Sequence, residues 1–191
     1  MTIVFRRTGQ RRYGVEVLRP GFPDVMMHPA PGYDRLIPHD MMHLVVEAQL
    51  GLSRAIFGQL AAGGNAGTFQ LTDKANEKPR DDKRIRKRAG SRGRKLLKQG
   101  RDECAQSERA TYICWQEWLA RSPSRELSKL GKEMAQQARE VRDTGLTSLN
   151  KRKLDEICEH LDELSSYWSR LDVGQSVAVS WPDLSIVNSG R

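Results

Sequence analysis

Cysteine, aromatic residues and long apolar runs are all scarce in this sequence of 191 residues. The three cysteines are too few for a disulfide framework, and an odd number cannot all pair with one another. We therefore expect reduced thiols in a cytoplasmic protein. No apolar run approaches the roughly 20 residues that a membrane-spanning helix needs. The N-terminal residues MTIVFRRTGQRR also lack the apolar region of a secretory leader, so we expect neither a membrane span nor export.

Positive charge is concentrated in one segment. The chain has a net charge of +8, and residues 74–101 contain 13 Lys and Arg but only three acids. That segment carries +10, so the rest of the chain carries −2. Its only large apolar side chains are Ile85, Leu96 and Leu97, which bury too little surface to offset the entropy of ordering. We expect a basic, loosely ordered segment at about 64–101, either loop or loosely ordered helix.

The spacing of apolar residues predicts an α+β fold that is mainly helical. Alternating apolar residues in 3–17 predict a β-hairpin, and the same pattern at 176–181 predicts a strand beside it. A short strand is expected at 24–28. Helical spacing predicts helices at about 38–50, 52–62, 102–120, 124–142 and 154–171. We expect one domain over 1–191, in which a small antiparallel sheet from both chain ends packs on four to five helices.

The clearest helical stripe lies near the C-terminus. Apolar residues three and four positions apart form it: Leu154, Ile157, Leu161, Leu164, Trp168 and Leu171. Such a stripe is either core or a surface that pairs helices. The first interpretation predicts that Leu161 and Leu164 are nearly inaccessible. The second predicts a homo-oligomer formed through helices.

The helix at 38–50 carries the only candidate catalytic constellation. At 100° per residue, His39, Asp40, His43 and Glu47 share one narrow stripe of an otherwise apolar helix. Histidines four positions apart can ligate one metal ion, with Glu47 as third ligand or with Glu47 or Asp40 as general base. Alternatively, the stripe is the solvated edge of a mostly buried helix, or a buried polar network without metal.

This helix and the residues after it contain the motifs His39-Asp40-x-x-His43, Leu50-Gly51 and Phe57-Gly58-Gln59. The pattern resembles the zinc-binding helix of the coenzyme Q biosynthesis protein four family, in which a later Glu completes the site. Here Ala55 stands twelve residues after His43, and Gln59 follows Gly58 where the family has Glu. A metal site would therefore recruit Glu47 or a more distant carboxylate, and the family's quinone chemistry is not carried over. The stretch also resembles segments of bacterial proteins of unknown function.

Two classes of function follow from these features. The first is a small cytoplasmic metalloprotein that binds zinc or another divalent transition metal through His39 and His43, with metal-dependent hydrolysis as its candidate activity. The second is a nucleic-acid-associated module in which residues 74–101 bind phosphates and the histidine stripe is structural. A helical interaction protein without a catalytic site is a third alternative.

The nucleic-acid hypothesis assigns its contacts to the basic segment. No aromatic residue lies in 74–101, so bases have nothing to stack on, and binding should be phosphate-directed and nearly independent of sequence. The candidate contacts are Arg84, Arg86, Lys87, Arg88, Arg92, Arg94 and Lys95. The alternative for such a charge run is a solubilising loop.

Overall fold

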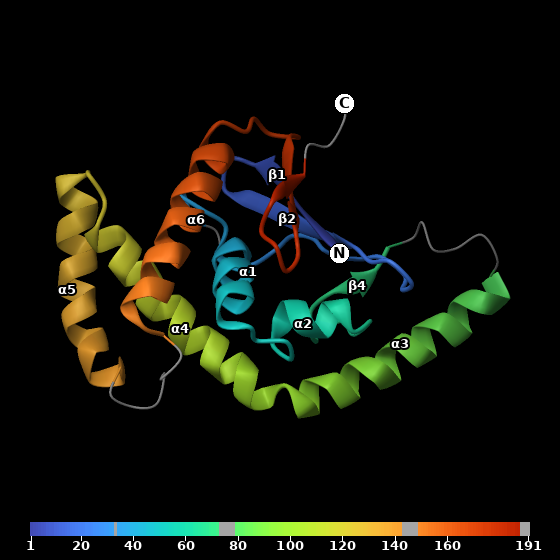
Figure 1. The fold of residues 1–191 in the computed structure, drawn as a ribbon. Coiled ribbons are helices and arrows are strands. Elements are labelled where there is room, and N and C mark those ends of the chain that lie inside the picture. Colours follow the sequence, from blue (N-terminus) through green and yellow to red (C-terminus); the bar gives the residue numbers. More distant parts are fainter. Residues whose placement is uncertain (33, 73–78, 143–148, 188–191) are drawn as a thin grey trace.

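Strands from both ends of the chain form one sheet (Figure 1). The computed structural model describes residues 1–32, 34–72, 79–142 and 149–187. Its six strands are antiparallel and lie in the order β4-β3-β2-β1-β5-β6. The strands are β1 (Thr2–Gly9), β2 (Arg12–Leu18), β3 (Val25–Met27), β4 (Gln70–Leu71), β5 (Ser176–Ser180) and β6 (Ile186–Val187). The expected antiparallel sheet from both chain ends is confirmed.

The register of the central strands places their apolar residues on one face. Ile3 lies opposite Val17 and Phe5 lies opposite Val15 in the β1–β2 hairpin. These four side chains are buried, because alternate residues of a strand point to the same side of the sheet. Strand β5 pairs with the other edge of β1 and places Val177 opposite Phe5. Strand β5, from the C-terminal part of the chain, is therefore an inner strand of the sheet.

Helices supply the rest of the fold. They are α1 (His39–Leu50), α2 (Ile56–Ala61), α3 (Pro79–Gln99), α4 (Arg101–Ala120), α5 (Arg125–Arg142) and α6 (Lys151–Ser169). Helix α1 packs against α4 and α6, and α5 packs against α4. Helix α3 lies along the lower right edge of the molecule and leads into α4 (Figure 1). The mainly helical α+β class is confirmed.

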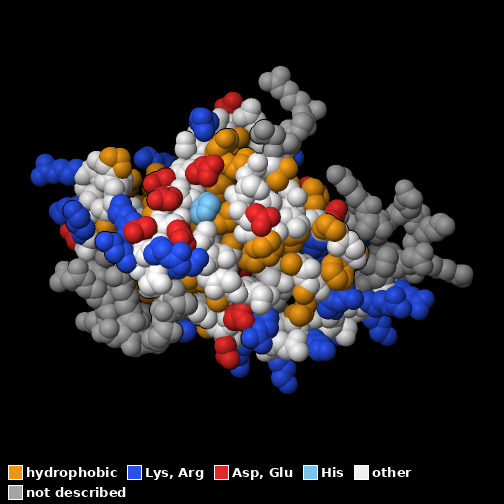
Figure 2. Space-filling view, viewed as in Figure 1, with side chains coloured by type: hydrophobic (Ala, Val, Ile, Leu, Met, Phe, Trp, Pro, Cys, Tyr) orange, Lys and Arg blue, Asp and Glu red, His pale blue; other side chains and the backbone are white. Residues whose placement is uncertain are grey.

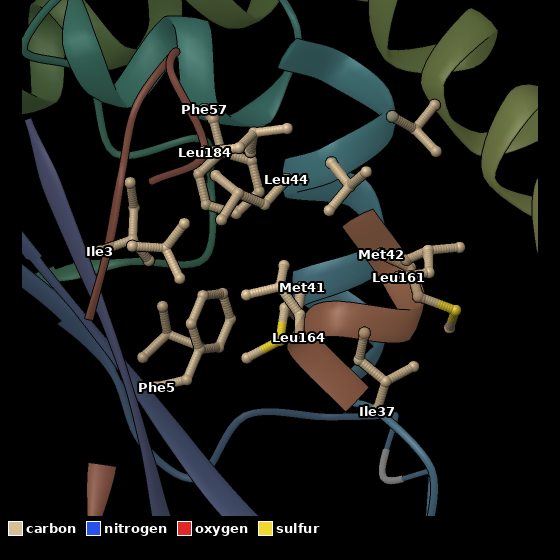
Figure 3. Packing of buried hydrophobic residues seen from close by; sticks show 14 of the residues in the cluster. Ile3, Phe5, Ile37, Met41, Met42, Leu44, Phe57, Leu161, Leu164 and Leu184 are labelled. Atoms are coloured by element: carbon tan, nitrogen blue, oxygen red, sulfur yellow. The ribbon is translucent and has the colours of Figure 1, made fainter. Parts of the chain in front are cut away.

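The core lies between the sheet and the helices α1 and α6 (Figure 3). Ile3 and Phe5 of β1 face Met41 of α1, and Leu164 of α6 lies beside Met41. Leu161 is 0% and Leu164 1% exposed, so the prediction that both are nearly inaccessible is confirmed. The C-terminal apolar stripe is therefore core in this chain.

Two helices differ from the expected boundaries. The expected helix at 52–62 is only Ile56–Ala61, and the reason lies in its N-terminal contacts, described below. Within the basic segment expected to be loop or loosely ordered helix, residues 79–99 form the 21-residue helix α3. None of the helices in the described ranges is long and apolar enough to cross a membrane.

Candidate functional site

The polar stripe of α1 is mostly buried. Asp40, His43 and Glu47 are 9%, 1% and 0% exposed, and only His39 is exposed. The stripe is therefore not the solvated edge of the helix. Because buried polar groups need partners, each of the three buried side chains has to be followed to its hydrogen bonds.

Glu47 caps the short helix α2. Its carboxylate accepts hydrogen bonds from the backbone N–H of Ile56 (3.2 Å) and of Phe57 (2.8 Å). The N-cap residue, Ala55, has no side-chain acceptor for these groups. This contact sets the start of α2 at Ile56. Burial raises the pKa of Glu47 to about 8, although these hydrogen bonds oppose the shift.

A serine links Glu47 to His43. Ser107 Oγ, from α4, donates to Glu47 Oε1 at 2.8 Å and lies 2.8 Å from His43 Nδ1. Thr111 Oγ1 lies 3.3 Å from the same nitrogen. Burial and, to a smaller extent, the neighbouring His39 lower the pKa of His43 to about 3. His43 is therefore a neutral imidazole at neutral pH.

The hydrogen bonds of Ser107 couple the protonation of Glu47 to the position of the hydrogen on the His43 ring. A hydroxyl has one hydrogen, so when Ser107 donates to an ionised Glu47, it accepts from His43 Nδ1–H. His43 Nε2 then carries a lone pair. When Glu47 is protonated, both hydrogen bonds can reverse, and the hydrogen moves to Nε2. In either case Nε2 lies 3.6 Å from Glu108 Oε2.

Asp40 is held between the helix and the sheet. Tyr13 of β2 donates its hydroxyl hydrogen to Asp40 Oδ2, and the same hydroxyl lies 2.7 Å from the Pro31 carbonyl oxygen. Burial raises the pKa of Asp40. Burial and Asp40 together raise the pKa of Tyr13 well above its ordinary value. This side chain is thus part of a structural contact.

A cavity of about 320 Å³ opens between α1 and α4. Its wall includes His39 and Met42 of α1, and Glu108, Thr111, Tyr112 and Trp115 of α4. The ring centroids of His39 and His43 are 4.7 Å apart. A small cavity with a largely apolar wall and a few polar groups is typical of a small-molecule site.

The structure thus brings together two of the predicted ligands and separates the others. His43 lies beside His39 and 3.6 Å from Glu108, and His39 and Glu108 both line the cavity, whereas Glu47 and Asp40 are engaged elsewhere. In the described ranges no three His, Cys, Asp or Glu side chains are close enough to hold a metal ion as they stand. Sequence analysis missed Ser107, Glu108 and Thr111, because nothing in the pattern of α4 links it to α1.

The predicted nucleic-acid contacts lie on α3. All of the candidate cations there are exposed: Arg84, Arg86, Lys87, Arg88, Arg92, Arg94 and Lys95. The Arg92 guanidinium lies over the Phe22 ring, 4.8 Å from its centroid. Arg86 lines a second cavity with Arg19 and Gly90.

Comparison with protein-family models, with curated proteins and with solved structures finds no match to this chain. The resemblance of α1 to a zinc-binding helix therefore rests on its sequence motif alone.

Proposed function

We propose that the protein binds a divalent transition metal, zinc above all, between α1 and α4, beside the cavity that His39 and Glu108 line. The proposed ligands are His39, His43 through Nε2, and Glu108. This assignment keeps the histidine pair predicted from the sequence and replaces Glu47 by a carboxylate of α4. The observation that carries it is the hydrogen-bonding of His43, whose Nδ1 is held from behind while Nε2 faces Glu108.

The arrangement behind His43 is what a metal ligand requires. A ligating histidine donates its other ring N–H to a hydrogen-bond acceptor, which fixes the ring and the tautomer. Here Ser107 supplies that acceptor when it donates its own hydrogen to an ionised Glu47. Because the pKa of Glu47 is raised to about 8, metal binding near neutral pH would release the Glu47 proton. The lowered pKa of His43 keeps the ring neutral, and metal binding needs that form. Glu47 thus supports the site through Ser107 without touching the metal.

The distances allow the proposed coordination after small side-chain movements. Two ligands at about 2.0–2.1 Å from a tetrahedral ion lie about 3.3 Å apart. His43 Nε2 and Glu108 Oε2 are 3.6 Å apart. The side chain of Glu108 is 64% exposed, and His39 is exposed as well, so both can rotate onto an ion.

We further propose that the bound metal makes the protein a hydrolase for small molecules. Three protein ligands leave a fourth position for water, and a metal ion lowers the pKa of that water enough to form hydroxide near neutral pH. The adjoining cavity has the volume and the largely apolar wall to bind a small substrate. Tyr112 and Trp115 would pack against its apolar part.

The test is a zinc titration of metal-free protein, with variants at the two exposed ligands. Wild type should bind about one equivalent, whereas His39→Ala and Glu108→Gln should each weaken binding at least tenfold, because each removes one of three ligands. Both positions are exposed, so the fold should persist in circular dichroism. His160→Ala on α6 is the matched control and should bind as wild type does. Equal affinity in all four proteins, or no binding by wild type, would contradict the metal site.

The hydrolytic step has its own measurement. Zinc-loaded protein should release chromophore from a panel of aryl esters and aryl phosphate esters, and His39→Ala should abolish the release. Zinc binding without such activity on any member of the panel would leave a metal-binding protein and overturn the hydrolase assignment.

A further inference from the structure

Helix α3 carries a continuous basic face that the body of the protein does not cover. Six cations form this face: Arg84, Lys87, Arg88, Arg94, Lys95 and Lys98. All six are exposed, and none forms an ion pair with an acidic side chain in the described ranges. Figure 2 shows basic side chains along the lower right edge, where α3 runs in Figure 1. We infer that this face, which we call the α3 basic face, binds the phosphate backbone of duplex DNA.

The six cations share one side of the helix. At 100° per residue they fall within an arc of about 120°. From residue 84 to residue 98 the rise of 1.5 Å per residue gives a length of about 21 Å. Such a row can meet several phosphates of one duplex at once, because the phosphates of each strand recur every few ångströms.

The opposite side of α3 holds it to the body. Leu96 lies over Gly64, and Gly93 is so close to Asn65 that a Cβ there would meet Asn65 Oδ1 at 2.4 Å. Arg92 is held over Phe22. The α3 basic face as we propose it therefore leaves out Arg92, and also Arg86 on the far side of the helix, and it includes Lys98.

Chemistry favours DNA over an anionic membrane. A helix that lies in a membrane surface presents a broad apolar face with aromatic or leucine residues. Leu96 and Leu97 are the only apolar side chains larger than alanine that the structure describes on α3, and they lie against Gly64 and Gly67 of the body. Leu97 is 38% exposed, but one half-covered leucine is not the broad apolar face that a lipid surface requires.

Shape favours a DNA duplex over single strands and over duplex RNA. The helix has no aromatic residue on which unpaired bases could stack. The major groove of B-form DNA admits an α-helix, whereas that of A-form RNA is too narrow for side chains to read. The helix lies along the lower right edge of the molecule (Figure 1), and its six cations are exposed, so a duplex can approach the α3 basic face along its length.

The test measures fluorescence anisotropy of a labelled DNA duplex over a range of salt concentrations. EDTA is present, so the result does not depend on the proposed metal site. Wild type should bind more weakly as salt rises, with a log–log slope of about −0.9 for each phosphate contacted. The variant Arg84→Gln/Lys87→Gln/Arg88→Gln should reduce the magnitude of the slope by about 2.7 and the affinity at least tenfold at 0.1 M salt.

The control removes the same charge from another surface. Arg125→Gln/Lys132→Gln/Lys151→Gln replaces three exposed cations on and near α5 and α6 and should keep the slope of wild type. Circular dichroism should show unchanged helix content in both variants, since Gln is nearly as good a helix former as Lys and Arg. An equal loss of affinity in both variants would show that DNA binding depends on the net charge of the protein and not on the α3 basic face.

Three other outcomes would overturn the proposal. One is wild-type binding that persists at 1 M salt or survives the α3 substitutions. A second is equal competition by single-stranded oligothymidine, which would exclude duplex selectivity. The third is binding to vesicles rich in phosphatidylserine without binding to DNA, which would reassign the face to a membrane surface.

Discussion

Glu47 and His43 lie one helical turn apart, and burial shifts their pKa values in opposite directions. The pKa of Glu47 rises from 4.5 to about 8, and that of His43 falls from 6.5 to about 3. A raised pKa means that the contribution of Glu47 to stability is complete below pH 4.5 and is lost as pH rises through 8. A lowered pKa means that the contribution of His43 is complete above pH 6.5 and is lost as pH falls toward 3. Between 4.5 and 6.5 the two effects oppose each other.

Above pH 6.5 the effect of His43 on stability no longer changes with pH, so the effect of Glu47 can be measured there with the variant Glu47→Gln. In metal-free wild type this group should lower the free energy of unfolding by about 2 kcal/mol between pH 6.5 and 8, at about 1.4 kcal/mol per pH unit. Glu47→Gln keeps an acceptor for α2 and cannot ionise, so its stability should be nearly flat over that range. Urea unfolding at several pH values measures both profiles, with Glu163→Gln at an exposed position of α6 as control. A parallel decline in wild type and Glu47→Gln would contradict the assignment.

At the scale of elements, the α4–α5 pair depends on a glycine. A Cβ at Gly131 would lie 2.2 Å from the backbone N of Ala120 and 2.7 Å from the carbonyl oxygen of Gln116. Only glycine allows this close approach of two helices without displacing one of them. Gly90 of α3 shows the opposite situation, because its nearest neighbour would be an Arg94 side-chain nitrogen at 3.8 Å.

The two glycines make a matched pair for substitution. Gly131→Ala should destabilise the protein by about 1–3 kcal/mol, because the clash outweighs the better helix propensity of alanine. Gly90→Ala has no clash and should leave stability unchanged or raise it by up to about 1 kcal/mol. Thermal unfolding followed by circular dichroism distinguishes them. Stabilisation by both substitutions would mean that α4 and α5 separate without cost.

On the scale of the whole molecule, one core joins the two ends of the chain. Leu161 of α6 is 0% exposed and belongs to the same buried cluster as Ile3 of β1. Helix α6 and strand β5 together connect the C-terminal part of the chain to its first strand. A defect at Leu161 should therefore affect global stability and not only the local helix.

Leu161→Ala should lower the free energy of unfolding by about 2–5 kcal/mol, since it removes buried methyl groups and leaves a cavity. Leu130→Ala is the control: Leu130 is 43% exposed on α5, and surface substitutions usually change stability by less than about 0.5 kcal/mol. Urea unfolding measured by tryptophan fluorescence gives both values. Similar small losses in the two variants would place Leu161 outside the common core.

Much of the fold could be predicted from local patterns. Strands β1, β2 and β5 and helix α6 each bury one face, so their apolar residues repeat at a fixed spacing that can be seen within the segment itself. The spacing is every second residue in the three strands, and every third or fourth residue in α6. The position of β5 beside the hairpin was also predicted from the sequence, since an isolated apolar strand needs a neighbour, but its pairing with β1 and not β2 was seen only in the structure. Helix α3 was harder, because its stability comes partly from contacts of Leu96 and Gly93 with residues about 30 positions earlier.

The candidate site also could be predicted only in part from the sequence. The sequence by itself determined that His39 and His43 share one face of a helix, because four residues make about one turn. Only the tertiary structure decided that Glu47 caps α2, that Asp40 meets Tyr13, and that Ser107 and Glu108 face the histidines from α4. Those partners lie between 9 and 65 positions away along the chain. Helix periodicity specifies the face a residue occupies, but which side chain lies across from that face depends on how the helices pack.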